Sequence, residues 1–143
     1  MGATLAIILL LASGAVPTAA DRQVLAEINV LRPPDSQLTW SDSLYDTAQA
    51  KSGELERSDG KCAIDSCDGT GWITRVSRLY GPYDQLAQLA GPMVGTARGL
   101  VAGWQARSAH VAILNDPRLR DAACAIGPSS AEGSWVVCHL ARR

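Results

Sequence analysis

The order of apolar patterns along this 143-residue chain predicts one α+β domain. Apolar residues recur at helical spacing in most segments up to residue 109, whereas residues 121–140 hold two apolar runs around a loop rich in Pro, Ser and Gly. The first pattern is typical of amphipathic helices and the second of an antiparallel β-hairpin. Because strands and helices do not alternate regularly, we expect helices layered on an antiparallel sheet rather than a doubly wound parallel sheet.

The N-terminal segment differs in composition from the rest of the chain. It has no charged side chain over residues 1–20, an apolar run over residues 5–11, and small residues around Pro17. A membrane helix needs about 20 apolar residues, so this run is too short to span a bilayer comfortably. The pattern predicts a signal peptide over residues 1–20, cleaved after Ala20, and a secreted mature domain over residues 21–143, either extracellular or periplasmic. An uncleaved anchor is the alternative.

Two helices are expected in the first part of the mature domain. In the first, one face is apolar at helical spacing and a Pro-Pro pair ends the helix. In the second, a serine is the expected N-cap, and an aromatic pair stands at the positions of a hydrophobic staple. The residues concerned are Val24, Leu25, Ile28, Leu31, Pro33 and Pro34 for the first helix, and Trp40, Ser41, Leu44, Tyr45, Ala48 and Leu55 for the second.

The middle of the chain is expected to contain a loop, a third helix and an ambiguous stretch. Residues 57–71 are polar and contain three glycines and two cysteines, which is typical of a loop. In residues 71–81, the side chains of Trp72, Val76 and Leu79 align on one helix face. Residues 82–92 fit either a short strand or a helical turn.

A fourth helix is expected over residues 92–109. Its apolar side is formed by Met93, Leu100, Val101 and Trp104. Three glycines, Gly95, Gly99 and Gly103, recur every four residues and leave part of the helix without side chains. In a membrane this spacing would indicate helix dimerisation. Because Arg98 interrupts the run in a chain expected to be secreted, close packing on a sheet or on another helix is favoured.

Four cysteines in a secreted domain of this size predict two disulfides. Cys124 and Cys138 lie symmetrically about the middle of the expected hairpin, so they should face each other across it and form one bridge. Cys62 and Cys67 would then close a small loop. Zinc binding is the rival interpretation, but the C-x4-C spacing differs from the usual C-x2-C pairs.

The charge balance bears on the class of partner. Thirteen basic residues stand against 14 acidic ones, and the only basic cluster is the C-terminal pair Arg142-Arg143. Nucleic-acid binders draw much of their affinity from neutralising phosphates, so a nucleic-acid partner is not expected. The sequence also contains neither a phosphate-binding Walker loop nor a G-x-G-x-x-G fingerprint.

The order of several segments resembles the secreted CAP superfamily (cysteine-rich secretory proteins, antigen 5 and pathogenesis-related proteins), above all its compact bacterial members. The segments are "VLAEINVLR", "LTWSDSLYDTAQAKSGEL", "DGTGWITRVSRLYG", "VAGWQARSAHVAILNDPRLRDAACAIG" and "SWVVCHLA". The most specific are "AHVAILNDP" and the L-x-W that precedes the second expected helix. The resemblance implies an α-β-α sandwich with a central antiparallel sheet, flanking helices and a surface cleft.

The resemblance also implies candidate residues for that cleft. His110 matches the histidine of the family's W-x3-S-x2-H segment, Asp84 matches the glutamate of its G-E-N-I-A motif, and Gln85 matches the asparagine of that motif. Many members hold two histidines and two acidic residues there, in some cases around zinc. This chain has no histidine in "KCAIDSC", where the second is expected, and it lacks the second glutamate near Trp104.

These departures decide between two classes of function. Zinc usually takes three or four protein ligands, whereas only His110 and Asp84 are at hand, with Cys62 and Cys67 as outside candidates if reduced. No cofactor is therefore expected. The favoured interpretation is a secreted, non-catalytic binding module for a small apolar ligand, a lipid or a partner protein. The alternative is a metal-dependent or histidine-based hydrolase that uses His110 and Asp84.

The two histidines also have structural interpretations. At the expected end of a helix, the imidazole of His110 can hydrogen-bond the following loop and interact with the helix dipole. His139 follows Cys138 in the terminal strand, so its side chain should point to the opposite face of the sheet, and no catalytic role is expected for it.

Overall fold

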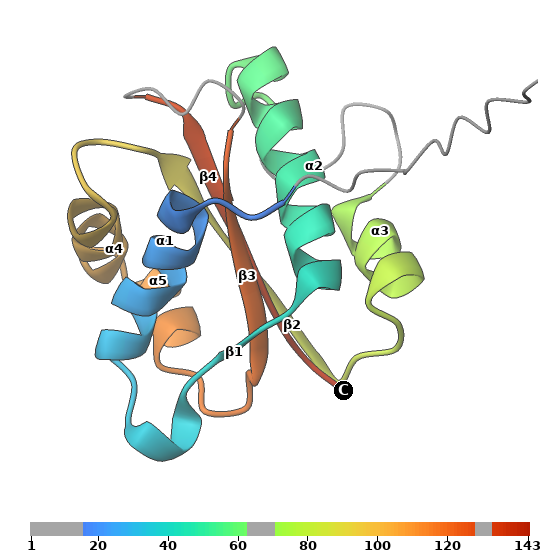
Figure 1. Ribbon diagram of the computed structural model, residues 1–143, viewed down its shortest axis with the longest axis vertical. Coiled ribbons are helices and arrows are strands. Elements are labelled where there is room, and N and C mark those ends of the chain that lie inside the picture. Colours follow the sequence, from blue (N-terminus) through green and yellow to red (C-terminus); the bar gives the residue numbers. More distant parts are fainter. Residues whose placement is uncertain (1–15, 63–70, 128–132) are drawn as a thin grey trace, which may run out of the picture.

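The computed structural model describes residues 16–62, 71–127 and 133–143. Five α-helices, one short 3-10 helix (η1) and four strands follow one another in these ranges (Figure 1). In chain order they are α1 Ala19–Val30, η1 Pro34–Ser36, β1 Thr39–Trp40, α2 Asp42–Ser58, α3 Trp72–Leu79, β2 Gln85–Pro92, α4 Ala97–Gln105, α5 Ser108–Leu114, β3 Asp121–Ile126 and β4 Trp135–Arg142.

The helices lie in two layers on either side of one sheet (Figure 1). α2 packs on β3 and β4, and α3 packs against α2. The helices α1, α4 and α5 cover the opposite face of the sheet. The predicted α-β-α sandwich is therefore confirmed. In the described part of the chain, no helix is both long enough and apolar enough to cross a membrane.

The sheet has the strand order β1-β3-β4-β2. β3 and β4 form the predicted antiparallel hairpin, and β2 pairs antiparallel with β4, so the ambiguous stretch before Pro92 is a strand. The two-residue strand β1 pairs parallel with β3, so the sheet is antiparallel at its centre and parallel only at this edge. A parallel pair needs a long connection, and the chain between β1 and β3 supplies it with four helices and β2.

Alternation along β3 and β4 divides the core into two clusters. Cys124, Cys138 and Leu140 face α1 and α4, whereas Ala123 and Val137 face α2 and α3. Successive strand side chains point to opposite faces, so a hairpin that is buried on both sides has almost no polar positions. Every residue from Val136 to Ala141 is buried.

The predicted bridge between Cys124 and Cys138 is present and lies directly across the hairpin. Cys62 also takes part in a disulfide. Its predicted partner, Cys67, lies outside the described residues.

Helix α1 begins at Ala19, two residues before the expected start of the mature domain. Thr18 is its N-cap: the Thr18 side chain accepts a hydrogen bond from the Asp21 amide, and the Asp21 carboxylate accepts one from the Thr18 amide. This reciprocal pair is a capping box. The boundary predicted after Ala20 therefore falls inside the first turn of α1.

The caps of α2 and the burial of α3 follow the sequence pattern with one exception. Ser41 caps α2, and the rings of Trp40 and Tyr45 lie 5.6 Å apart, as the predicted staple requires. In α3, Val76 is buried, but Leu79, which aligns with it on the expected helix face, is 49% exposed. Tyr80, one position later, takes the buried place.

The single helix expected over residues 92–109 is replaced by two helices. Met93 still belongs to the segment that pairs with β4, α4 starts after the N-cap Thr96, and Arg107 separates α4 from α5. His110 therefore lies in the first turn of α5, not at the end of a helix. The helix-dipole explanation offered for it is wrong, because a helix N-terminus disfavours a cationic imidazole.

A buried arginine joins distant parts of the chain on the α1 side. The Arg32 guanidinium donates to the backbone oxygens of Ser36, Leu114, Asp116 and Leu119 at 2.6–3.1 Å. These oxygens belong to η1, to the end of α5 and to the loop before β3. Arg32 therefore supplies hydrogen-bond donors to carbonyl groups at this end of the α1 layer, which would otherwise be buried without donors.

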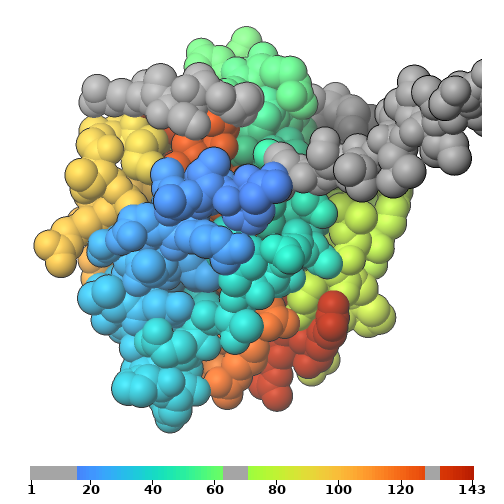
Figure 2. Space-filling view, viewed as in Figure 1, coloured from blue at the N-terminus to red at the C-terminus, as the bar shows by residue number. Residues whose placement is uncertain are grey.

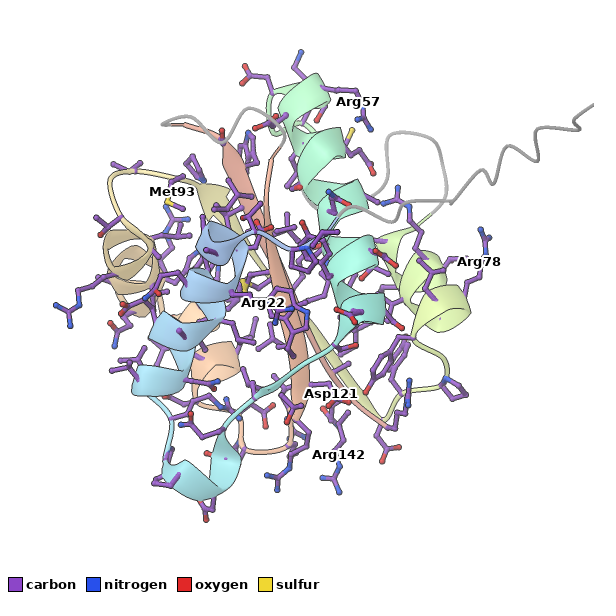
Figure 3. The ribbon with its side chains drawn as sticks, viewed as in Figure 1. Arg22, Arg57, Arg78, Met93, Asp121 and Arg142 are labelled. Carbon is purple, nitrogen blue, oxygen red and sulfur yellow. A yellow bond between two sulfur atoms is a disulfide. The ribbon has the colours of Figure 1, made fainter. Side chains whose placement is uncertain are left out.

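The charged side chains otherwise lie mostly at the surface. Figure 3 shows Arg57, Arg78 and Arg142 pointing away from the body of the molecule, and all three are exposed. Arg22 instead lies over the ring of Trp40, with its guanidinium carbon 4.5 Å from the ring centroid.

Candidate functional site

Two pockets border strand β2, one toward each end of the strand. The first, named here the His110 pocket, has a volume of about 460 Å³ and lies between β2, α4, α5 and Trp135. The second, named the edge pocket, has a volume of about 740 Å³ and is bordered by α3, the first half of β2 and the end of α5. Both fall within the usual size range of small-molecule sites, about 300–1,000 Å³.

Trp104 forms the inner wall of the His110 pocket. Its indole N–H donates to the backbone oxygen of Ala90 at 3.2 Å, which ties α4 to β2. The side chain is 3% exposed and belongs to the core cluster, as the sequence pattern predicted. Gly91 allows this contact, because a Cβ there would approach the indole nitrogen to 3.1 Å.

His110 stands beside this tryptophan with one ring nitrogen unpaired. The two rings meet edge to face, with centroids 6.4 Å apart. The Nδ1 atom of His110 is buried and has no hydrogen-bond partner among the residues that the structure describes. Burial, together with the cation of Arg107, lowers the pKa of His110 below its ordinary value. The imidazole is therefore neutral at neutral pH.

The other two predicted cleft residues lie toward the opposite end of β2. Gln85, the first residue of the strand, lines the edge pocket, whereas Asp84 is exposed and donates its backbone N–H to the Arg142 oxygen at 2.7 Å. Ala90, which lines the His110 pocket, lies six positions after Asp84 along the extended strand, which corresponds to about 20 Å. The structure therefore does not bring His110 and Asp84 together.

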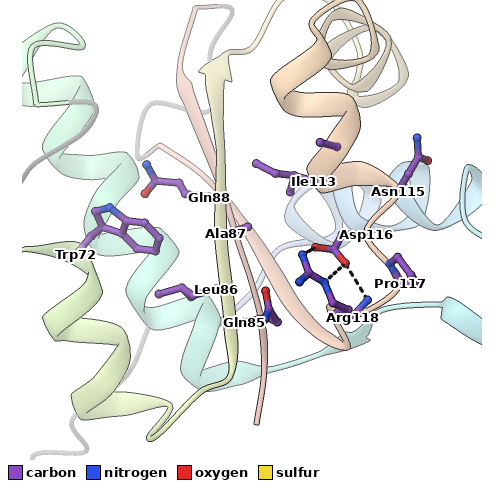
Figure 4. A pocket seen from close by; sticks show the side chains of 11 residues that line it. Trp72, Gln85, Leu86, Ala87, Gln88, Ile113, Asn115, Asp116, Pro117 and Arg118 are labelled. Carbon is purple, nitrogen blue, oxygen red and sulfur yellow. Dashed lines mark hydrogen bonds and ion pairs between the residues drawn. The ribbon is translucent and has the colours of Figure 1, made fainter.

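The edge pocket is lined by both layers of the sandwich. Figure 4 shows Trp72 on one side of β2 and Ile113 and Asp116 on the other. Asp116 holds Arg118 through two side-chain hydrogen bonds of 2.9 and 3.0 Å, and this pairing lowers the pKa of the carboxyl group. The pocket is therefore open and polar on the α5 side and aromatic on the α3 side.

Behind this pocket lies a buried histidine whose environment the sequence did not reveal. As predicted, His139 points away from Cys138, and it meets the α2 layer. Its Nδ1 lies 2.7 Å from the Thr47 hydroxyl, its Nε2 lies 2.9 Å from Gln88 Oε1, and its ring stacks on Trp72 at 4.7 Å. The sequence did contain one signal of this environment. His139 lies in an apolar strand that is expected to be buried, and a buried imidazole requires polar partners.

His139 should make the domain sensitive to acid. Its complete burial, with the nearby cations of Lys51 and Arg75, lowers its pKa to about 3, whereas an unfolded histidine titrates at about 6.5. Below pH 6.5 the unfolded chain binds a proton that the native state excludes, so stability falls as the pH decreases from about 6.5 toward 3. Between pH 7 and pH 5 we expect a loss of about 2 kcal/mol from this residue.

Urea unfolding of the wild type and of His139→Gln at pH 7 and pH 5 measures this effect. The variant should lose about 2 kcal/mol less than the wild type over this interval. His110→Gln is the matched control, because His110 is less buried and should contribute less to the pH dependence. An equal loss in the wild type and in His139→Gln would show that His139 is not the acid-sensitive group.

The residues around His110 bear on the chemistry that its pocket can support. Ser108 lies two positions before His110 in α5, and helix residues two apart do not face each other. Among the residues that the structure describes, no three His, Cys, Asp or Glu side chains come close enough to hold a metal ion. One neutral imidazole in an aromatic pocket can donate or accept a hydrogen bond.

Comparison with known proteins agrees with this architecture. The family model described as CAP, the cysteine-rich secretory protein family, matches residues 25–140. An outer surface protein of Borrelia burgdorferi has a similar structure, with a TM-score of 0.73 and 15% identity over 90% of this chain and 96% of the other. No curated protein sequence matches this chain.

Two longer bacterial proteins also contain the fold. An extracellular protein with an SCP domain from Bacillus anthracis str. Ames gives a TM-score of 0.71 at 14% identity over 87% of this chain. A cysteine-rich secretory protein from Staphylococcus aureus subsp. aureus Mu50 gives 0.60 at 12% identity over 89%. This chain spans only 40% and 41% of their respective lengths. At such identities the likeness concerns the fold alone.

Proposed function

Since this chain belongs to the cysteine-rich secretory protein (CAP) family, we propose that it is an exported, non-catalytic binding module whose His110 pocket holds a small apolar ligand. The similar structures support export, because one is described as extracellular and another as an outer surface protein. A signal peptide at the N-terminus is part of this proposal.

The observation that carries the proposal is the unpaired Nδ1 of His110 in a pocket with mainly apolar walls. A buried polar atom without a partner is uncommon in folded proteins and calls for an explanation. A ligand that is mostly hydrocarbon but carries one polar atom would fill the pocket, and a turn of the His110 ring that exposes the buried Nδ1 would let the two polar atoms pair. Leu100, Trp104 and Trp135 would contact its apolar part.

Two features favour binding over hydrolysis in this pocket. A hydrolase needs a base together with an orienting group and a nucleophile or activated water. Asp84, the predicted partner of His110, does not line this pocket and lies about 20 Å along β2 from Ala90, which does. The indole of Trp104, which is the ring beside His110, can donate a hydrogen bond but cannot act as a base.

Filling the pocket from helix α4 should abolish binding without unfolding the domain. A Cβ added at Gly103 meets no atom within 4 Å, so Gly103→Phe can place its ring at the mouth of the pocket. Titration with the fluorescent apolar probe 1-anilinonaphthalene-8-sulfonate should show an affinity at least about tenfold lower than that of the wild type.

Ala102→Phe is the matched control, because Ala102 is exposed on the same helix and does not line the pocket. It should bind the probe as the wild type does, and both variants should unfold at the urea concentration of the wild type. Equal probe affinity in Gly103→Phe and Ala102→Phe would exclude the His110 pocket as the binding site. His110→Ala should weaken ligands that carry a polar group and leave purely apolar ones unchanged.

A further inference from the structure

We propose that the leader is cleaved between Ala15 and Val16, so that residues 16–20 remain in the mature domain and begin helix α1. This inference rests on the export proposed above, but it does not depend on the ligand or on the His110 pocket. It moves the cleavage point five residues upstream of the position after Ala20 that composition alone favours.

The first argument is the capping of α1. The Thr18 hydroxyl accepts from the Asp21 amide at 3.1 Å, and the Thr18 oxygen accepts from the Arg22 amide at 3.2 Å. These bonds satisfy two of the amides that every helix leaves unpaired at its start. Pro17, directly before the cap, is half-buried against the domain. Residues 17 and 18 therefore behave as parts of the folded domain.

The second argument is the Asp21 carboxylate, which links α1 to two other elements. The side chain is 2% exposed. One oxygen accepts from the Tyr45 hydroxyl of α2 at 2.8 Å and from the Thr18 amide at 2.8 Å, and the other accepts from the Ile126 amide at the end of β3 at 2.9 Å. Burial and the hydrogen bond to Asp21 also raise the pKa of the Tyr45 hydroxyl.

Cleavage after Ala20 would disturb this arrangement. It removes Thr18 and therefore both reciprocal bonds of the capping box, one of which is the hydrogen bond from the Thr18 amide to the Asp21 carboxylate. The Arg22 amide also loses its acceptor, the Thr18 backbone oxygen. It also turns the Asp21 amide nitrogen into a charged ammonium at the positive end of the helix, where the macrodipole disfavours a cation. The mature chain would start inside a helical turn.

Cleavage after Ala15 retains every one of these contacts. The three residues before that bond are Ser13, Gly14 and Ala15, which are all small, as leader cleavage requires. This motif also follows the apolar run over residues 5–11 more closely than the one that ends at Ala20. In the reaction, the leader peptidase of the export route adds water across the Ala15–Val16 peptide bond. The leader keeps the new carboxylate, and Val16 keeps the new ammonium.

The surface position of the site is compatible with a free N-terminus at Val16. Figure 2 shows the start of α1, in deep blue, at the surface of the molecule, and Val16 is 81% exposed. An ammonium at this position is solvated and lies outside the capping box. The Asp21 bonds are therefore the same before and after cleavage.

The test is the mass and N-terminal sequence of the full-length chain exported by a secreting bacterial host. We expect the exported protein to begin with Val-Pro-Thr-Ala-Ala-Asp. A protein that begins at Asp21, or at any other residue, overturns the proposed cleavage point while leaving export and binding intact. A chain that stays in the cells with its leader attached contradicts both this inference and the export part of the proposed function.

Two matched leucine variants separate the two cleavage points. Ala15→Leu places a large residue directly before the proposed bond and should stop cleavage there. Ala20→Leu alters the other point at an exposed helical position, so it should leave the N-terminus at Val16. If Ala20→Leu blocks processing and Ala15→Leu does not, the inference is wrong. Urea unfolding of the exported chain with Thr18→Ala should show a lower midpoint than the wild type, which it would not if Thr18 lay outside the domain.

Discussion

Replacing Arg32 by methionine should lower the free energy of unfolding by about 4 kcal/mol. The guanidinium donates to four backbone oxygens, on Ser36, Leu114, Asp116 and Leu119. Methionine fills a similar volume but donates no hydrogen bond, so buried carbonyl groups would lose their partners, each at a cost of about 1–3 kcal/mol. Urea unfolding, followed by far-UV circular dichroism, measures the loss.

Arg32→Lys tests the geometry of the same contact. An ammonium has three donors on one atom and cannot reproduce the fork of a guanidinium, so this variant should fall between methionine and the wild type. Arg120→Met is the control, since Arg120 is exposed and its side chain donates to a single acceptor in the described part of the chain, the Asp35 oxygen at 3.0 Å. Its effect should stay within about 0.5–1 kcal/mol. Similar losses of stability in Arg32→Met and Arg120→Met would contradict the stabilising role assigned to the four Arg32 hydrogen bonds.

Removing the disulfide with Cys124→Ala and Cys138→Ala together should cost about 3 kcal/mol. The two cysteines are 14 positions apart. Closing a loop of this length lowers the conformational entropy of the unfolded chain, which stabilises the folded state by about 3 kcal/mol. Both side chains are fully buried between β3 and β4, so loss of packing adds to this cost. Urea unfolding of the double variant beside the wild type gives the difference.

Burial of this disulfide also predicts how it reacts with a reductant. Dithiothreitol must reach a sulfur atom, and neither sulfur is accessible in the native fold, so reduction should proceed only as fast as the hairpin opens. Adding urea below the unfolding midpoint should then accelerate reduction. Rapid reduction without urea, or an unchanged unfolding midpoint in the double variant, would contradict this account.

The parts of the fold that the sequence predicted correctly depend on local patterns. The hairpin with its disulfide followed from two apolar runs that lie symmetrically about a turn-rich loop. Ser41 and the Trp40–Tyr45 pair marked the start of α2, because caps and staples involve residues only a few positions apart. The family resemblance supplied the layered arrangement that such patterns leave open.

The errors arose where a distant contact outweighed the local pattern. Residues 92–109 have helical spacing, but Met93 pairs with the segment before β4, and Arg107 breaks the helix before α5. Leu79 matches the helix period, yet Tyr80 takes the buried place and donates its hydroxyl to Asp121 at 2.6 Å. Neither contact is encoded in the spacing of neighbouring residues.

The candidate site shows the same division. Local properties of the sequence, a motif and an alternation, were enough to predict that His110 belongs to a family segment and that His139 and Cys138 face opposite sides of a strand. The folded chain was needed to see that His110 lies beside Trp104 in a pocket that Asp84 does not line, and that Thr47, Gln88 and Trp72 enclose His139. The physical reason is that burial and pairing depend on which helices pack on each face of the sheet, and that packing joins residues far apart in the chain.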